Sequence, residues 1–298
     1  CLGAGNMFQA NQAYVQFVNV TGGESSMFAT RGWLFGSILA ILTALVIIGG
    51  IRSIARVTSK LVPFMALLYV STALVVIGAN AAALPGALVT IVREAFSPEG
   101  VTGGMFAVLI LGFRRAAFSN EAGIGSAAIA HSAVRTKEPL TQGFVAMLEP
   151  FIDTVVICTI TALVITLTVY DPALLNDGVI SGVELTSSAF ASVIPWFPYV
   201  LAVAVILFAY STMLAWSYYG LEGFIYIFGP KRWAKVTFNS IFCLFVIIGC
   251  TMELDTVLDF SDAMIFAMAL ANVLGLYLLV PVVKRDLDVY WARKCSNP

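Results

Sequence analysis

Long apolar stretches recur along this chain and limit the folds that are open to it. They cover residues 3–20, 32–50, 61–83, 102–134, 141–169, 196–228, 233–250 and 260–283. A transmembrane α-helix needs about 20 mostly apolar residues, and each stretch reaches or approaches that length, although the first is short and polar. Because 60% of the residues are hydrophobic and only 11% are charged, we expect an all-α polytopic membrane protein in which each stretch forms one transmembrane helix.

The basic residues support this set of crossings, because short cytoplasmic loops are enriched in Lys and Arg. If the chain starts in the cytoplasm, the loops on that side contain 12 of the 16 basic residues, namely Arg52, Arg56, Lys60, Arg135, Lys137, Lys231, Arg232, Lys235, Lys284, Arg285, Arg293 and Lys294. The loops on the opposite side contain only Arg31 and Arg93. We therefore expect a multi-pass protein of the cell (plasma) membrane, with both ends of this sequence in the cytoplasm.

Several other classes of protein are excluded. The net charge is -1, and the basic residues form no stripe of the kind that binds nucleic acid. The five cysteines lack C-x-x-C spacing, so we expect neither a metal site nor a disulfide framework. The chain begins at Cys1 without an initiator Met or a signal peptide. We expect it to be the C-terminal part of a longer protein and not to transport by itself.

Residues 84–98, between the third and fourth stretches, have the pattern of an amphipathic helix at the membrane interface. Apolar side chains there lie opposite Arg93 and Glu94.

A polar segment that contains glycines, residues 114–126, interrupts the fourth stretch. Backbone inside a membrane can leave the helix only where it lines a cavity or contacts protein. If the helix unwinds after Phe118, free amides and the helix dipole would suit a carboxylate, and Gly123 and Gly125 would let a small ligand approach the backbone. The alternative is a continuous helix whose glycines serve close helix packing.

Two other groups of polar residues lie inside apolar stretches. Gln9, Gln12 and Gln16 share one helix face, where they either contact a ligand or form interhelical hydrogen bonds. Ser211 and Thr212 offer oxygen donors for a small cation, unless their hydroxyls only bond their own helix.

Two carboxylates lie in the fifth stretch. Asp153 is about 20 Å from the nearest inner loop at the rise of an α-helix, and Glu149 lies one turn before it. We expect a structural ion pair with Arg114 or Arg115 here rather than a proton carrier. The single histidine, His131, is expected to form hydrogen bonds near a helix end and has no assigned role.

Six blocks, in order along the chain, resemble the alanine or glycine:cation symporter family, also called sodium:alanine symporters. They are Gly5-Asn6-Met7-Phe8-Gln9, Gly49-Gly50-Ile51-Arg52-Ser53-Ile54-Ala55, Leu61-Val62-Pro63-Phe64-Met65-Ala66, Phe118-Ser119-Asn120-Glu121-Ala122-Gly123, Phe151-Ile152-Asp153-Thr154 and Ser217-Tyr218-Tyr219-Gly220. The resemblance implies a LeuT-type fold of two inverted five-helix repeats in a single transporter domain over residues 1–298. Residues 1–83 would be the remainder of the first repeat and 102–283 the second, together core helices 3–10, with the fourth stretch as the broken sixth core helix.

The same resemblance implies roles for individual residues. Gln9 and the segment of Ser119, Asn120, Gly123, Ile124 and Gly125 would bind the amino acid. Met213 and Trp216 would close the pocket and limit side-chain size, while Ser211 and Thr212 would bind sodium.

We therefore expect sodium-coupled symport of alanine or glycine by alternating access, with sodium as a co-transported ligand and no cofactor. Such coupling requires only that sodium and substrate stabilise each other's binding, typically by about 1–3 kcal/mol. A proton-coupled carrier that uses Asp153 or Glu149 is the alternative, and a channel is a further one. We expect no enzyme activity, because no Ser/His/Asp set or metal-ligand spacing lies at a common depth.

Overall fold

The computed structural model describes residues 1–96, 105–169 and 182–296, and the regular secondary structure of these residues consists of helices joined by turns. Its first half contains η1 (Gly3–Met7), α1 (Phe8–Val20), η2 (Gly23–Ser25), α2 (Gly32–Ile47), α3 (Gly50–Ala79), η3 (Ala81–Ala83), α4 (Leu84–Ala95), α6 (Met105–Asn120) and α7 (Ser126–Ser132). Its second half contains α8 (Pro139–Ala146), α9 (Leu148–Pro150), the π-helix η4 (Phe151–Cys158), α10 (Thr159–Thr168), α12 (Val183–Ala191), α13 (Phe197–Phe228), α14 (Arg232–Gly249) and α15 (Leu254–Ser296).

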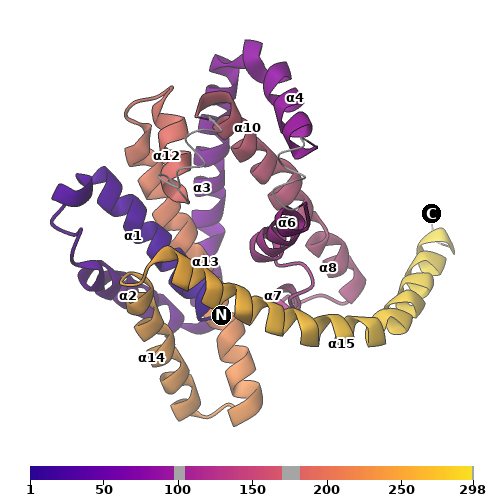
Figure 1. Cartoon of the computed structure of the whole chain (residues 1–298). Coiled ribbons are helices and arrows are strands. Elements are labelled where there is room, and N and C mark those ends of the chain that lie inside the picture. The colour runs from indigo at the N-terminus through magenta and orange to yellow at the C-terminus, as the bar shows by residue number, and fades with distance from the viewer. Residues whose placement is uncertain (97–104, 170–181, 297–298) are drawn as a thin grey trace.

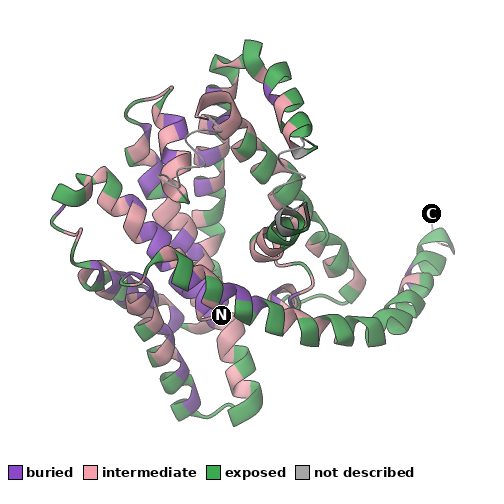
Figure 2. Cartoon of the chain, viewed as in Figure 1, coloured by how far each residue is buried: buried purple, intermediate pink, exposed green. Residues whose placement is uncertain are grey.

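Helix α13 is the central element of the fold, and α1, α2, α3, α12 and α14 pack against it (Figure 1). It contributes residues to all four buried apolar clusters, including Leu201, Met213, Leu214 and Trp216. In an apolar 18-residue segment of α13, 50% of the residues are buried, compared with 6–28% in the corresponding segments of the other long apolar helices. The buried residues accordingly gather where α13 meets α1, α2, α3 and α14 (Figure 2).

The outer surface carries many large apolar side chains, as expected of a surface that contacts lipid. Five helices in the described residues are long and apolar enough to cross a membrane by length and composition, and α2 is a shorter apolar helix. Large side chains such as those of Phe106, Leu270 and Leu278 are 70–80% exposed. Each of the expected apolar stretches contains a helix, so helical structure in these stretches is confirmed for the residues described.

Several helix boundaries differ from the expected ones. Helix α3 begins at Gly50 rather than at 61, because Arg and Lys are good helix formers although they lower hydropathy. Helix α15 extends beyond 260–283 at both ends and continues through Pro281. The expected helix over 84–98 is present as α4, and its last two residues lie outside the described part.

Helix α12 was not expected, because residues 183–191 look like part of a polar loop. It packs against α10 and α13. Its Phe190 is fully buried, and the ring lies 4.7 Å from that of Phe197 and 5.8 Å from that of Tyr69. Burial of the Phe190 ring therefore stabilises α12, a short helix that the polar composition of residues 183–191 did not predict.

An ion cluster fastens α6 to α15. The Asp262 carboxylate, whose side chain is 5% exposed, bonds the guanidinium groups of both Arg114 and Arg115. The expected ion pair between these arginines and Asp153 or Glu149 is therefore wrong. Asp262 lies on the face of α15 that packs against α6, a proximity that the sequence order does not reveal.

Replacing Asp262 with Ala should destabilise the protein by roughly 3 kcal/mol. This is the lower end for a broken buried pair, because 33% and 39% of the two arginine side chains stay exposed. The measurement is the melting temperature in detergent. Asp259 is the matched control, since its side chain is 83% exposed and 3.7 Å from Arg114, and Asp259→Ala should cost less than about 1 kcal/mol. Equal losses in the two variants would contradict this assignment.

Candidate functional site

The fourth apolar stretch is broken between α6 and α7, in agreement with the expected interruption; residues 102–104 lie outside the described part. Gly123 and Gly125 have φ angles of 81° and 100°, and Glu121 has a φ of 58°. These left-handed conformations cannot occur within a right-handed helix. The alternative of a continuous helix is thus wrong. Gly123 and Gly125 instead adopt the conformations that interrupt the helix.

Side chains replace the helical hydrogen bonds that the break removes. The Oδ1 of Asn120 accepts from the amide of Ala122 at 2.9 Å, and the Nδ2 of Asn272 on α15 donates to the carbonyl of Gly123 at 2.9 Å. The amide of Ile124 donates to the carbonyl of Glu121 at 3.3 Å. Two of the amides that we expected to be free for a ligand are therefore bonded within the chain.

The end of α6 is also bonded to the π-helix η4. The hydroxyl of Ser119 donates to the carboxylate of Asp153, and the Nδ2 of Asn120 donates to the hydroxyl of Thr154 at 3.1 Å. The wider turn of a π-helix changes the direction of successive side chains and often marks a functional position. Here it places both Asp153 and Thr154 against the residues just before the break.

A first cavity of about 430 Å³, the α1–α6 cavity, lies beside the break. Its lining residues are Ala4, Phe8, Gln9, Arg115, Phe118, Ser119, Glu121, Thr212 and Trp216. Gln9, Ser119 and Trp216 were expected to bind substrate, and they come from three different helices. The structure therefore brings these three residues together in one cavity.

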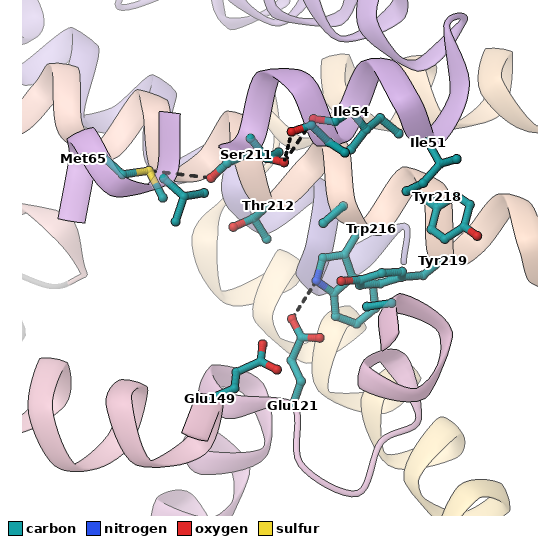
Figure 3. A pocket seen from close by; sticks show the side chains of 15 residues that line it. Ile51, Ile54, Met65, Glu121, Glu149, Ser211, Thr212, Trp216, Tyr218 and Tyr219 are labelled. Carbon is teal, nitrogen blue, oxygen red and sulfur yellow. Dashed lines mark hydrogen bonds between the residues drawn. The ribbon is translucent and has the colours of Figure 1, made fainter. Parts of the chain in front are cut away.

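A second cavity of about 380 Å³, the α3–α13 cavity, lies between those two helices (Figure 3). It is lined by Ile51, Ile54, Ala55, Thr58, Val62, Met65, Glu121, Ala130, Glu149, Ser211, Thr212, Ala215, Trp216, Tyr218 and Tyr219. Glu121, Thr212 and Trp216 line both cavities. These three residues therefore form the boundary between them.

Ser211 and Thr212 differ in how their hydroxyls are used. The hydroxyl of Ser211 donates to the carbonyl of Phe208 at 2.9 Å, which is the bond to its own helix that we had considered as an alternative. The hydroxyl of Thr212 has no hydrogen-bond partner within the described ranges. The Thr212 hydroxyl is therefore available to a ligand both as donor and as acceptor, whereas that of Ser211 has only its oxygen lone pairs left.

Met213 does not line either of these cavities. It is fully buried in the apolar cluster formed with Ala10, Phe238 and Phe242 on the other side of α13. Successive residues of an α-helix are about 100° apart, so the cavity face that holds residues 212 and 216 turns away from 213. The expectation that Met213 closes the pocket directly does not fit this placement.

The remaining expected residues shape the break. Asn120, Gly123 and Gly125 are engaged as described above, and Ile124 is 2% exposed in an apolar cluster with Trp216. None of the four is among the lining residues of the two cavities. Their positions indicate that they keep the backbone of the break non-helical and do not line a cavity.

The polar face of α1 forms mainly interhelical hydrogen bonds. The Nε2 of Gln16 donates to the hydroxyl of Ser187 on α12 at 3.2 Å, and the Oε1 of Gln12 accepts from the amide of Val183 at 3.1 Å. Among the described residues, the side chain of Gln9 bonds only the nearby carbonyl of Ala4, at 3.3 Å, and it lines the α1–α6 cavity. Gln9 is thus the member of this face that is placed for a ligand.

Glu121 is a site residue that the sequence reading missed. Its Oε1 accepts from the indole Nε1 of Trp216 at 2.8 Å, and its Oε2 accepts from the hydroxyl of Ser126, the first residue of α7. Figure 3 shows its carboxylate close to that of Glu149 in the α3–α13 cavity. An acidic residue inside an apolar stretch was the signal that could have identified it.

Comparison with known proteins identifies similar sequences. The chain matches the sodium:alanine symporter family over residues 1–297. It is 38% identical over 291 residues to the sodium/alanine symporter AgcS of Methanococcus maripaludis, covering 97% of this chain and 62% of that protein.

Two of the similar proteins from Bacillus subtilis have names that describe amino-acid transport. The chain is 34% identical over 278 residues to the amino-acid carrier protein AlsT (93% of this chain, 58% of AlsT). It is 32% identical over 291 residues to the probable sodium/glutamine symporter GlnT (97% and 58%). The chain thus spans 58–62% of the length of these three relatives.

Replacing Gly125 with Ala should lower both stability and any activity that depends on the break. A left-handed conformation costs an L-residue about 1–2 kcal/mol, and the added Cβ would lie 3.1 Å from the Oδ1 of Asn272. Melting temperature and ligand binding would be measured together. Gly112→Ala is the control, because an added Cβ at Gly112 within α6 would meet none of the described atoms outside its own helix backbone within 4 Å, and it should gain roughly 0.5–1 kcal/mol. Equal tolerance of the two substitutions would argue against a fixed break.

Proposed function

The chain belongs to the sodium:alanine symporter family, and we propose that it forms a substrate-binding part of a sodium-coupled symporter for alanine or glycine. The family and its named relatives are transporters rather than enzymes. The observation that carries the proposal is the convergence of Gln9, Ser119, Thr212 and Trp216 on one cavity beside a helix break. Broken helices beside a cavity are where many secondary transporters bind substrate and ions.

In this proposal the amino acid binds in the α1–α6 cavity. The amide of Gln9 and the hydroxyl of Ser119 supply hydrogen bonds, and Trp216 forms an apolar wall. Asn120, Gly123, Ile124 and Gly125 act by keeping the backbone of the break non-helical, and Met213 anchors the opposite face of α13 in the buried core. The size of the cavity, about 430 Å³, is enough for a small amino acid and its hydration water.

Sodium binds next to Thr212, with Ser211 as a second oxygen donor. A hydroxyl without a partner at the boundary of two cavities suits a small hard cation, which prefers oxygen ligands. Sodium and substrate then stabilise each other because they share this boundary. Reciprocal stabilisation of this kind is sufficient for coupling and needs no resident cofactor.

We further propose that the helices form a LeuT-type inverted repeat within one transporter domain over residues 1–298. Residues 1–83 belong to the first repeat and 102–283 to the second, with eight crossings of the plasma membrane and α6–α7 as the broken sixth core helix. The described break and the family support this arrangement. Transport follows by alternating access, in which the two cavities open in turn.

A proton-coupled carrier is the second candidate, favoured by one observation. The carboxylates of Glu121 and Glu149 face the same cavity (Figure 3), and Glu149 lies 3.6 Å from His131. Asp153 is engaged by Ser119 instead. Groups that lie this close together can exchange a proton, so Glu149 is the stronger proton candidate of the two carboxylates in the fifth stretch.

Sodium coupling predicts a specific effect of Thr212→Ala in the full-length protein. In proteoliposomes, the sodium concentration for half-maximal alanine uptake should rise about tenfold, which corresponds to about 1.4 kcal/mol of lost binding free energy. Thr212→Ser keeps the hydroxyl and should change that concentration by less than about threefold. Uptake that continues without sodium and follows an imposed pH gradient, and that is lost in Glu149→Gln, would favour the proton-coupled carrier.

The proposed orientation predicts that Cys295 faces the cytoplasm. Cys295 is exposed near the end of α15, so a variant that retains it as the only cysteine can be labelled with a membrane-impermeant maleimide. Labelling should occur only after the cells are permeabilised. Labelling of intact cells would show that this end of the chain lies outside.

A further inference from the structure

Trp216 has the largest side chain of the three residues that form the boundary between the two cavities. It lines both of them, yet only 3% of its surface is exposed, because its other sides pack against protein. Ala4, Ile124 and Ile265 surround it in one apolar cluster. The position of the indole therefore sets the extent of each cavity.

The root of the indole is fixed by Gly5. A Cβ built on Gly5 would lie 2.0 Å from Cγ and 2.5 Å from Cβ of Trp216, so α13 and η1 approach each other here at the closest distance that a glycine permits. Gly5 is not among the residues with positive φ. Glycine is needed at this position because any side chain would collide with Trp216. The Cβ and Cγ atoms of Trp216 therefore cannot move toward η1.

The far edge of the indole is fixed by Glu121. The Nε1 of Trp216 donates to the Oε1 of Glu121 at 2.8 Å, and the other carboxylate oxygen is bonded to Ser126 (Figure 3 shows the indole bond). The carboxylate thus joins α13 to the start of α7. Loss of this acceptor would free the outer part of the ring while its root stays against Gly5.

The backbone at Glu121 indicates that its side chain is needed. Among the described residues, Glu121 is the one non-glycine residue with a positive φ, 58°. Glycine would adopt this conformation without strain. Strained residues persist where the surrounding structure holds them and where the strain serves function.

We propose that Glu121 is a positioning residue that determines substrate size by holding the Trp216 indole as the wall between the cavities. The proposal rests on the proposed function, since it assumes that the α1–α6 cavity receives an amino acid. Glu121 acts through its hydrogen bond and not through its charge. A substrate with one more methylene than alanine is rejected because the fixed ring cannot yield.

The test compares alanine with 2-aminobutyrate, which is longer by one methylene, as substrates of the full-length protein in proteoliposomes. Discrimination of one methylene is typically 10- to 200-fold. In Glu121→Gly, which suits the backbone and removes the carboxylate, the ratio of kcat/KM for 2-aminobutyrate to that for alanine should rise about tenfold. Glu121→Gln keeps a carbonyl acceptor and should stay within about threefold of the native ratio.

A double-mutant cycle tests the hydrogen bond itself. Trp216→Phe removes the donor and part of the ring volume, so it should raise the ratio at least as much as Glu121→Gly does, and the double variant should raise it no further than Trp216→Phe alone, because the shared contact is already broken. Glu222→Gln is the control, since Glu222 lies on α13 but is not among the residues of either cavity, and its ratio should equal the native one. An effect of Glu121→Gln as large as that of Glu121→Gly, or additive effects in the double variant, would overturn the proposal.

A second measurement does not require transport. In a variant with Trp216 as the only tryptophan, acrylamide quenching of its fluorescence should at least double in Glu121→Gly and remain unchanged in Glu121→Gln. Unchanged quenching in Glu121→Gly would show that the carboxylate does not hold the indole. Absence of sodium-driven alanine uptake by the native protein, with quenching as expected, would reject the proposed function and leave the indole contact established.

Discussion

The need to satisfy backbone hydrogen bonds inside a membrane governs this structure. An unpaired amide or carbonyl in hydrocarbon costs several kcal/mol, so residues 121–125 can leave the helix only because other groups replace the lost partners. Asn120 supplies one acceptor and Asn272 one donor. Glu121 adds the contacts to Trp216 and Ser126. The cavities exist beside the break because these contacts make it stable.

Helix α13 gives the break a fixed neighbour. Its Met213 side packs into the buried cluster with α2 and α14, while residues 212 and 216 face the cavities. One helix therefore divides its surface between an apolar core and a polar boundary. This division explains why adjacent residues, Thr212 and Met213, have such different surroundings.

The sequence alone predicted what depends on local chemistry. Apolar stretches predicted the helices, and the polar interruption with Gly123 and Gly125 predicted the break, because positive φ angles favour glycine. It did not predict contacts that depend on how helices pack. The ion cluster at Asp262 joins residues about 150 positions apart, and α12 buries the ring of Phe190 where it packs against α10 and α13.

Only some residues of the candidate site could be predicted from the sequence. Gln9, Ser119, Thr212 and Trp216, which were predicted to bind substrate or sodium, line one cavity, and their ligand roles stay a prediction. Glu121 was passed over, although a carboxylate in an apolar stretch is costly and usually has a function. Met213 was placed on the wrong side, because a spacing of three residues leaves two side chains about 60° apart, enough for one to enter the core.

Helix α15 contacts both α6 and the break that follows it, and this limits how the two can move relative to each other. Asp262 holds α6 through its arginines, and Asn272 holds the carbonyl of Gly123. These two anchors are ten residues apart, or about 15 Å along the helix axis. Helix α15 thus ties the end of α6 to the break. Any movement of residue 123 away from α6 must bend α15 or release one of these two anchors.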